Sequence, residues 1–153
     1  MGTEPAAPDF TEAMNAGAGG WNRAMGLRFV RATADEVVGE LLIGPEHLQP
    51  HGIVHGGVYA GVVETVASVG AGLSAGARGF TAVGLENHTS FLRAVRSGTL
   101  RAVARPLTRG RRTQVWEASV TDDAGRVAAT GRVRLLCIEP GSELAGEKAG
   151  TLA

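Results

Sequence analysis

The sequence is poor in three residue types that carry specialised chemistry. Its 153 residues include a single cysteine, Cys137, which excludes a disulfide framework and a zinc site built from several thiolates. There is also a single lysine, and the seven aromatic residues are few for a protein that stacks on nucleic-acid bases. No apolar run of about 18 residues lacks an interrupting Gly, Glu or Ser. We therefore expect neither a nucleic acid nor a membrane as a partner.

Targeting signals are also missing from the first residues. They include acids but no basic stretch before an apolar one, and Ala6 stands where an N-myristoylation signal has Ser or Thr. Apolar residues make up 44% of the chain and charged residues 20%, which is typical of a globular protein. These features predict one soluble domain in the cytoplasm.

The net charge of zero conceals two regions of opposite sign. Residues 1–77 carry three arginines and eight acids, whereas residues 78–134 carry eleven arginines and four acids. Such a basic region suits the phosphates of a small anionic ligand. The alternative is that the arginines line the solvent face of strands.

Periodicity predicts an α+β fold in which a curled antiparallel sheet surrounds one long central helix. The segment from His55 to about Ser74 is apolar on nearly every side and too long for a strand, so we expect a buried helix. Its glycines weaken it intrinsically, so we expect the backbone of the sheet to approach closely there. Alternating patterns and short turns predict strands at 28–33, 36–43, 83–91, 100–105, 113–121 and 126–137.

The same patterns predict the domain limits and the faces of the strands. Residues 1–20 are expected to form a flexible arm with a short helix near Asp9–Asn15. Residues 21–138 are expected to form the domain, and residues 139–153 a disordered tail. In the third strand, alternation places the following residues on one face: Val83, Leu85, Asn87, Thr89 and Phe91.

Glu64 lies in the middle of the apolar helix, with Ser68 one turn later on the same face. A carboxylate in apolar surroundings costs several kcal/mol unless it is paired or its pKa rises. One interpretation is a wet stripe formed by Glu64, Thr65 and Ser68. The other is a catalytic base or nucleophile.

Just before the helix runs the segment Gln49-Pro-His-Gly-Ile-Val-His55-Gly56-Gly57. Glycines at a helix N-terminus let a ligand approach free backbone N–H groups at the positive end of the dipole, where a developing oxyanion can bind. The alternative is a tight turn with a structural histidine. Together with Glu64, however, these residues are typical of acyl transfer.

The spacing also bears on assembly. Glu64 lies eight residues after Gly56, which is roughly 12 Å along a helix. One carbonyl carbon must lie within about 3 Å of both its attacker and its oxyanion donors. One helix cannot supply both, so we expect a homodimer with two composite sites.

The motif Gln49-Pro-x-Gly-x-x-His55-Gly56-Gly57, followed by Val-Val-Glu64 and Ser68, resembles the hotdog-fold acyl-CoA thioesterases. The branch is the PaaI type, which includes 4-hydroxybenzoyl-CoA and 1,4-dihydroxy-2-naphthoyl-CoA thioesterases, and the similarity covers about residues 21–137. It implies a hotdog fold, a homotetramer built from two dimers, and an aromatic acyl-CoA substrate.

The resemblance also implies roles for individual residues. The Gly56 N–H polarises the thioester carbonyl, Glu64 of the neighbouring subunit attacks or activates water, Ser68 orients it, and Gln49 and His55 shape the carbonyl side. CoA or the acyl group is expected to contact Gly84, Phe91, Leu92, Arg93, Ala94, Thr108, Arg109, Gly110, Arg111, Arg112 and Thr113.

CoA is part of the substrate and product, and no cofactor or metal is expected. Two alternatives stay open: a hotdog protein that binds acyl-CoA without turnover, and an enoyl-CoA hydratase or dehydratase. The latter would be expected to place an Asp/His pair before the helix, and there is no Asp in that loop. His88 and Ser90 depart from the Asn-rich stretch of the resembling enzymes, which bears on the acyl preference.

Overall fold

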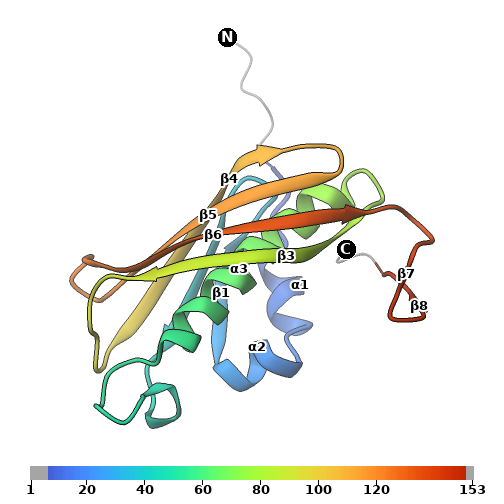
Figure 1. Cartoon of the computed structure of the whole chain (residues 1–153). Helices are drawn as coiled ribbons and strands as arrows, with labels where there is room; N and C mark the ends of the chain where they lie inside the picture. The colour runs from blue at the N-terminus through green and yellow to red at the C-terminus, as the bar shows by residue number, and fades with distance from the viewer. Residues whose placement is uncertain (1–6, 151–153) are drawn as a thin grey trace.

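Six strands form one antiparallel sheet that curves around a single long helix (Figure 1). The structure is a computed structural model in which residues 7–150 are described. The elements in chain order are α1 (Thr11–Ala16), α2 (Gly20–Met25), β1 (Leu27–Ala32), β2 (Val37–Leu42), the 3-10 helix η1 (Pro45–His47), α3 (Gly56–Gly76), β3 (Thr81–Phe91), β4 (Thr99–Arg109), β5 (Thr113–Thr121), β6 (Val127–Ile138), β7 (Glu143–Leu144) and β8 (Glu147–Lys148). The strand order of the main sheet is β1-β2-β4-β5-β6-β3. The predicted α+β architecture is thus confirmed.

Helix α3 forms the centre of the core because its side chains are apolar on almost every face. Val63 and Val66 have no exposed surface, and the sheet residues Leu135 and Val133 are equally buried in the same cluster. By length and composition α3 could also cross a membrane, but 72% of its most apolar stretch is buried inside the protein. Burial by the sheet is what allows so apolar a helix in a globular domain.

Two glycines of α3 lie where large aromatic side chains pack against the helix. A Cβ on Gly70 would lie 2.4 Å from the ring of Trp116, and one on Gly61 would lie 3.0 Å from Nε1 of Trp21. The expectation that sheet backbone makes these approaches was therefore wrong at both positions. Indole rings from β5 and from α2 occupy the space that a side chain would need.

The short helix predicted near Asp9–Asn15 is present as α1, and it packs on the sheet. Asn15 of α1 exchanges two hydrogen bonds with the backbone of Phe29, both at 2.9 Å, and Thr11 Oγ1 accepts from the Ala32 N–H. These side chains supply partners to the outer edge of β1, which ties α1 to the sheet. Residues 1–6 and 151–153 lie outside the described residues.

In the expected tail, β7 and β8 pair across a two-residue turn at Ala145 and Gly146. Both turn residues have positive φ, 52° and 85°. That combination is typical of the tightest hairpin turns. The small residues of this segment had indicated disorder, whereas Ala145 and Gly146 form a turn between two paired strands.

An irregularity in β3 changes which of its residues face α3. The pairing of β3 with β6 shifts register between Gly84 and Glu86. A bulge reverses the alternation beyond it, so Gly84 and Asn87 both face Glu64 although they are three positions apart. The predicted shared face of Leu85 and Asn87 was wrong because it assumed a regular strand.

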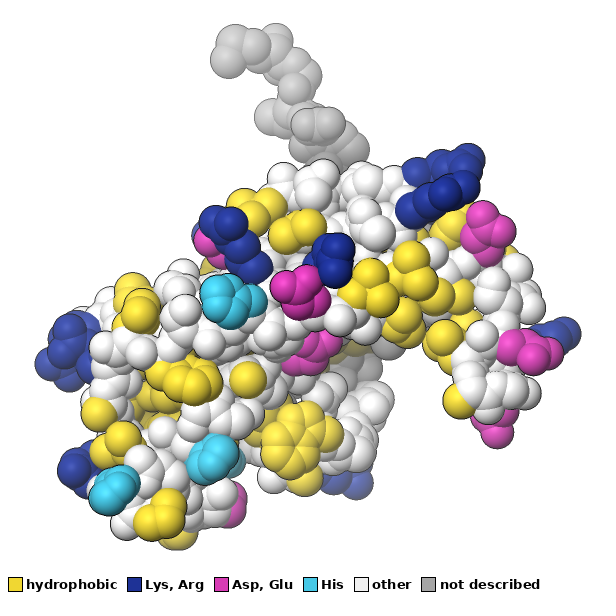
Figure 2. All heavy atoms as spheres, in the orientation of Figure 1, with side chains coloured by type: hydrophobic (Ala, Val, Ile, Leu, Met, Phe, Trp, Pro, Cys, Tyr) yellow, Lys and Arg dark blue, Asp and Glu magenta, His cyan; other side chains and the backbone are white. Residues whose placement is uncertain are grey.

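Most arginines of the basic region are paired with acids. Six of the eleven in residues 78–134 form ion pairs, namely Arg101–Glu40, Arg105–Glu36, Arg109–Asp35, Arg126–Asp122, Arg132–Glu117 and Arg134–Glu86. Figure 2 shows basic and acidic side chains next to one another on the outer surface of the sheet. The two regions of opposite charge meet because β4 lies beside β2.

Candidate active site

The first N–H groups of α3 are divided between a cap and a pocket. His55 is the N-cap residue: its Nδ1 accepts a hydrogen bond from the Gly57 N–H at 2.8 Å, and its carbonyl oxygen accepts from the Val58 N–H at 2.9 Å. The Gly56 N–H has no acceptor among residues 7–150. It therefore remains available, at the positive end of a 21-residue helix, to a carbonyl oxygen or an anion.

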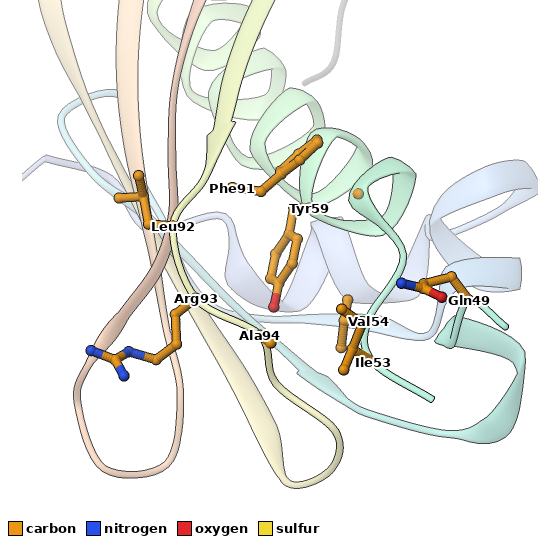
Figure 3. A pocket seen from close by; sticks show the side chains of 9 residues that line it. Gln49, Ile53, Val54, Tyr59, Phe91, Leu92, Arg93 and Ala94 are labelled. Carbon is orange, nitrogen blue, oxygen red and sulfur yellow. The ribbon is translucent and has the colours of Figure 1, made fainter. Parts of the chain in front are cut away.

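Gly56 opens onto a pocket of about 320 Å³ between the start of α3 and the end of β3. Figure 3 shows the loop before α3 on one side of this pocket and residues 91–94 on the other. Its lining residues are Gln49, Ile53, Val54, Gly56, Tyr59, Phe91, Leu92, Arg93 and Ala94. The structure thus brings three predicted parts of the site together, namely Gln49, Gly56 and residues 91–94. His55 is exposed and acts as the cap just beside them.

Gly56 lies directly against the ring of Phe91. A Cβ on Gly56 would lie 2.5 Å from the ring of Phe91, well inside any tolerated contact. The ring of Phe91 is 58% exposed, so it closes one side of the pocket without being part of the core.

The carboxylate of Glu64 is held by two side chains. Ser68 Oγ donates to Oε1 at 3.1 Å, and Asn87 Nδ2 donates to Oε2 at 2.9 Å. Asn87 also donates to the Ala60 carbonyl at 3.1 Å, and Thr89 Oγ1 donates to Asn87 Oδ1 at 2.6 Å. This chain of contacts fixes both carboxylate oxygens in place.

Sequence reasoning found Glu64 and Ser68 of this group and missed Asn87 and Thr89. The only signal for the two missed residues was their position in a stretch that departs from the resembling enzymes. His88 and Ser90, which that comparison singled out, alternate with Asn87 and Thr89 and lie on the opposite face of β3. They do not face Glu64.

Glu64 lines a second pocket, of about 370 Å³, with walls from α2, α3 and β3. Its residues are Trp21, Asn22, Glu64, Thr65, Ser68, Val69, Thr81 and Ala82. Asn22 Oδ1 accepts from the buried Thr65 Oγ1 at 3.0 Å, which holds α2 against α3. The indole of Trp21 is 61% exposed and offers a flat apolar wall beside the carboxylate.

Gly84, which is expected to contact CoA or the acyl group, lies directly against Glu64. A Cβ there would lie 2.5 Å from Glu64 Oε1, so in the structure the space belongs to the carboxylate itself.

The predicted oxyanion donor and the predicted carboxylate line different pockets of this chain. This agrees with their separation of roughly 12 Å along α3. Within one chain, Gly56 and Glu64 therefore do not meet at one pocket.

The two expected CoA segments are also far apart within one chain. Residues 91–94 begin at the last residue of β3. The Cys137 N–H donates to the Arg112 carbonyl beside the start of β3, where Thr81 pairs with Ile138. The eleven residues of β3 span about 33 Å at roughly 3.3 Å each. The turn at 108–113 and residues 91–94 thus lie at opposite ends of the sheet.

The arginines expected to bind phosphate fall into two groups. Arg109 donates to Asp35 Oδ1 at 2.6 Å and to the Ala34 carbonyl. Arg93, Arg111 and Arg112 form no ion pair with any of residues 7–150. Within those residues no three His, Cys, Asp or Glu side chains gather as a metal site would need.

A family model described as the thioesterase superfamily matches residues 51–129. Rv1847, a candidate esterase of Mycobacterium tuberculosis, is 38% identical over 117 residues, which cover 75% of this chain and 84% of the relative. The chain belongs to the thioesterase superfamily.

This thioesterase is similar to further members in sequence and in structure. The 1,4-dihydroxy-2-naphthoyl-CoA hydrolase of Escherichia coli K12 is 32% identical over 123 residues, covering 80% of this chain and 90% of the relative. The crystal structure of AziG from S. sahachiroi superposes with a TM-score of 0.76 at 41% identity, covering 79% of this chain and 98% of the other. The hotdog fold and the assignment as a thioester hydrolase are thereby confirmed.

Proposed function

We propose that this thioesterase hydrolyses acyl-CoA thioesters to a free acid and CoA, with an aromatic acyl group preferred. The observation that carries the proposal is how the Glu64 carboxylate is held and what it faces. Its two carboxylate oxygens are held by Ser68 and Asn87, and the carboxylate faces a pocket large enough for a small acyl group. A carboxylate needed only for stability would not require an open pocket in front of it.

The groups at the two pockets account for each step of the hydrolysis. The Gly56 N–H and the dipole of α3 stabilise the negative charge that develops on the thioester oxygen. Glu64 either attacks the carbonyl carbon, forming an anhydride that water then cleaves, or takes a proton from the water that attacks it. In both routes the carbon–sulfur bond breaks and the CoA thiolate leaves. Ser68 and Asn87 keep the carboxylate in line.

The proposal includes a homodimer in which each site combines two chains. Gly56, Gln49 and His55 of one subunit face Glu64 of the other, because one α3 cannot supply both groups. Two features support this: β3 is an edge strand of the sheet, and it also lines the Glu64 pocket. An unpaired edge next to an incomplete site is a natural place for a second copy.

CoA is the leaving group in this proposal, and no cofactor or metal takes part. Its thiol arm follows residues 91–94 into the Gly56 pocket. Arg111 and Arg112 of another subunit bind the nucleotide phosphates. Those of the same chain lie in a turn about 33 Å from residues 91–94, at the far end of β3. That arrangement favours a homotetramer, and the cytoplasmic location stays a prediction.

The preference for an aromatic acyl group rests on two points. Trp21 offers a largely exposed indole beside Glu64, on which a planar ring can stack. A relative with 32% identity is named as a hydrolase of an aromatic CoA thioester.

The test is thiol release from a panel of CoA thioesters, which contains benzoyl, 4-hydroxybenzoyl, 1,4-dihydroxy-2-naphthoyl, phenylacetyl, short-chain and long-chain esters. Glu64→Gln should fold, bind CoA, and lose turnover by roughly 10²–10⁴-fold. Wild-type rates in Glu64→Gln would refute the site. Tight binding of the esters without turnover by the wild type would make the protein a binder of acyl-CoA.

A mixing experiment tests the composite site separately. Glu64→Gln subunits and Gln49→Ala subunits, each weakly active alone, are unfolded together and refolded as mixed dimers. If the site combines two chains, mixed dimers contain one intact site, and activity should return to about a quarter of the wild-type value. No recovery would place both groups of each site in one chain.

A further inference from the structure

Tyr59 presents an unusual buried group. The residue is 2% exposed, and its hydroxyl is the single buried side-chain polar atom within residues 7–150 that has no hydrogen-bond partner. A buried polar group without a partner destabilises a fold, so each one needs an explanation. A phenylalanine would fill the same space without that cost.

The position of the hydroxyl offers the explanation. Tyr59 lies one turn after Gly56 on α3 and lines the same pocket. Its ring packs near Phe91, with centroids 6.0 Å apart. Figure 3 shows the hydroxyl at the end of the ring remote from Phe91, directed between Ala94 and Val54. The polar end of Tyr59 thus lies among the residues that the thiol arm of the substrate is expected to follow.

Of the two residues that lie nearest the hydroxyl in Figure 3, Val54 is buried in the core, whereas Ala94 is exposed. Phe91, Leu92, Arg93 and Ala94 are all exposed, and residues 92–94 follow the end of β3 without regular structure. A ligand that reaches the hydroxyl would therefore displace the exposed side of the pocket at Ala94, while Val54 keeps its place in the core.

The hydroxyl is suited to donate. Burial raises the pKa of Tyr59, and the negative charge of Asp122 raises that pKa further. The phenol therefore stays protonated throughout the neutral range and seeks an oxygen acceptor.

We propose that the Tyr59 hydroxyl is a binding group for the thiol arm and donates to the carbonyl oxygen of the arm amide nearest the sulfur. This inference rests on the proposed function, in which the Gly56 N–H holds the thioester oxygen. Only the sulfur and two methylene groups separate the thioester carbon from the nitrogen of that amide. Tyr59 lies one turn of α3 after Gly56 and lines the same pocket, so the two donors can serve two neighbouring acceptors of one ligand.

The experiment compares wild type and Tyr59→Phe on three esters of one acid. Benzoyl-CoA and S-benzoyl-N-acetylcysteamine contain the amide, whereas S-ethyl thiobenzoate does not. Tyr59→Phe should raise KM for the first two by about 3- to 10-fold, leave kcat unchanged, and leave S-ethyl thiobenzoate unaffected. It should melt no lower than wild type because it loses no internal hydrogen bond. Ser119→Ala, which removes a hydroxyl of β5 outside the pocket, should match wild type on all three.

A second measurement does not depend on turnover. Tyr59 is the only tyrosine of the chain, so a ¹³Cζ label produces one NMR signal. That signal should shift when CoA is added, and Tyr59→Phe should bind CoA about 3- to 10-fold more weakly by calorimetry. No shift and equal affinity, or an equal KM change on S-ethyl thiobenzoate, would overturn the inference. If wild type shows no turnover that depends on Glu64, the proposed function is refuted instead. The CoA-binding measurements would then still decide the role of Tyr59.

Discussion

Gly84 and Glu64 face each other across the contact between β3 and α3, and no larger residue fits between them. A Cβ on Gly84 would lie 2.5 Å from Oε1 and 3.5 Å from the carboxyl carbon of Glu64. The glycine on the strand thus determines where a carboxylate on the helix can lie. The bulge just beyond Gly84 then brings Asn87 to the other carboxylate oxygen.

Gly84→Ala should therefore damage catalysis more than stability. The methyl group displaces the end of a flexible side chain rather than backbone, so the fold should survive with little change in melting temperature. The carboxylate, however, must move away from Ser68, and kcat should fall by about tenfold or more. Steady-state kinetics beside a thermal melt would check this. An unchanged kcat would mean that the position of Oε1 does not matter for turnover.

Asn87→Ala should also lower kcat by about tenfold or more, because it removes the donor to Oε2. Thr89→Val should have a smaller effect in the same direction, since Thr89 only orients the Asn87 amide. His88→Ala is the matched control, because it lies on the same strand but on the opposite face. If His88→Ala were as damaging as Asn87→Ala, the strand rather than the contact with Glu64 would be responsible.

The role of the Gly56 N–H can be isolated by comparing two substitutions. Gly56 is the first residue of α3, where helices accept proline, and His55 has φ −66° and ψ 137°, which suits a residue before proline. Both substitutions add a Cβ that contacts the ring of Phe91, but only proline removes the N–H. We expect Gly56→Pro to be roughly 100-fold slower in kcat than Gly56→Ala. Equal rates for the two variants would exclude this N–H as the oxyanion donor.

Acid sensitivity should depend in part on Asp122. The side chain of Arg126, followed by the backbone N–H groups of Arg126 and Ala124, holds the pKa of Asp122 below its ordinary value of 3.8. A lowered folded-state pKa contributes stability above 3.8, and that stability is lost as the pH falls through the folded-state pKa. Asp122→Asn should therefore melt below wild type at neutral pH, and the difference should shrink in acid. A difference independent of pH would contradict this assignment.

The sequence alone was sufficient for the order of α3 and the six main strands, and for half of the candidate site. Apolar residues on every side of 55–74 required a buried helix, and alternation required strands after it. Glu64 stood out because a carboxylate in such an apolar helix is costly and needs an explanation. The glycine pair at the start of the helix indicated accessible N–H groups. The separation of Gly56 and Glu64 also follows from helix geometry alone.

Only the tertiary structure decided what surrounds those residues. The bulge in β3 depends on pairing with β6, so alternation along the chain put Asn87 on the same face as Leu85 and left its contact with Glu64 unseen. The space at Gly84 and the unpartnered hydroxyl of Tyr59 are likewise products of packing between segments distant in the sequence. Local patterns reflect the preferences of a segment, whereas a contact between α3 and β3 depends on how the whole chain folds around them.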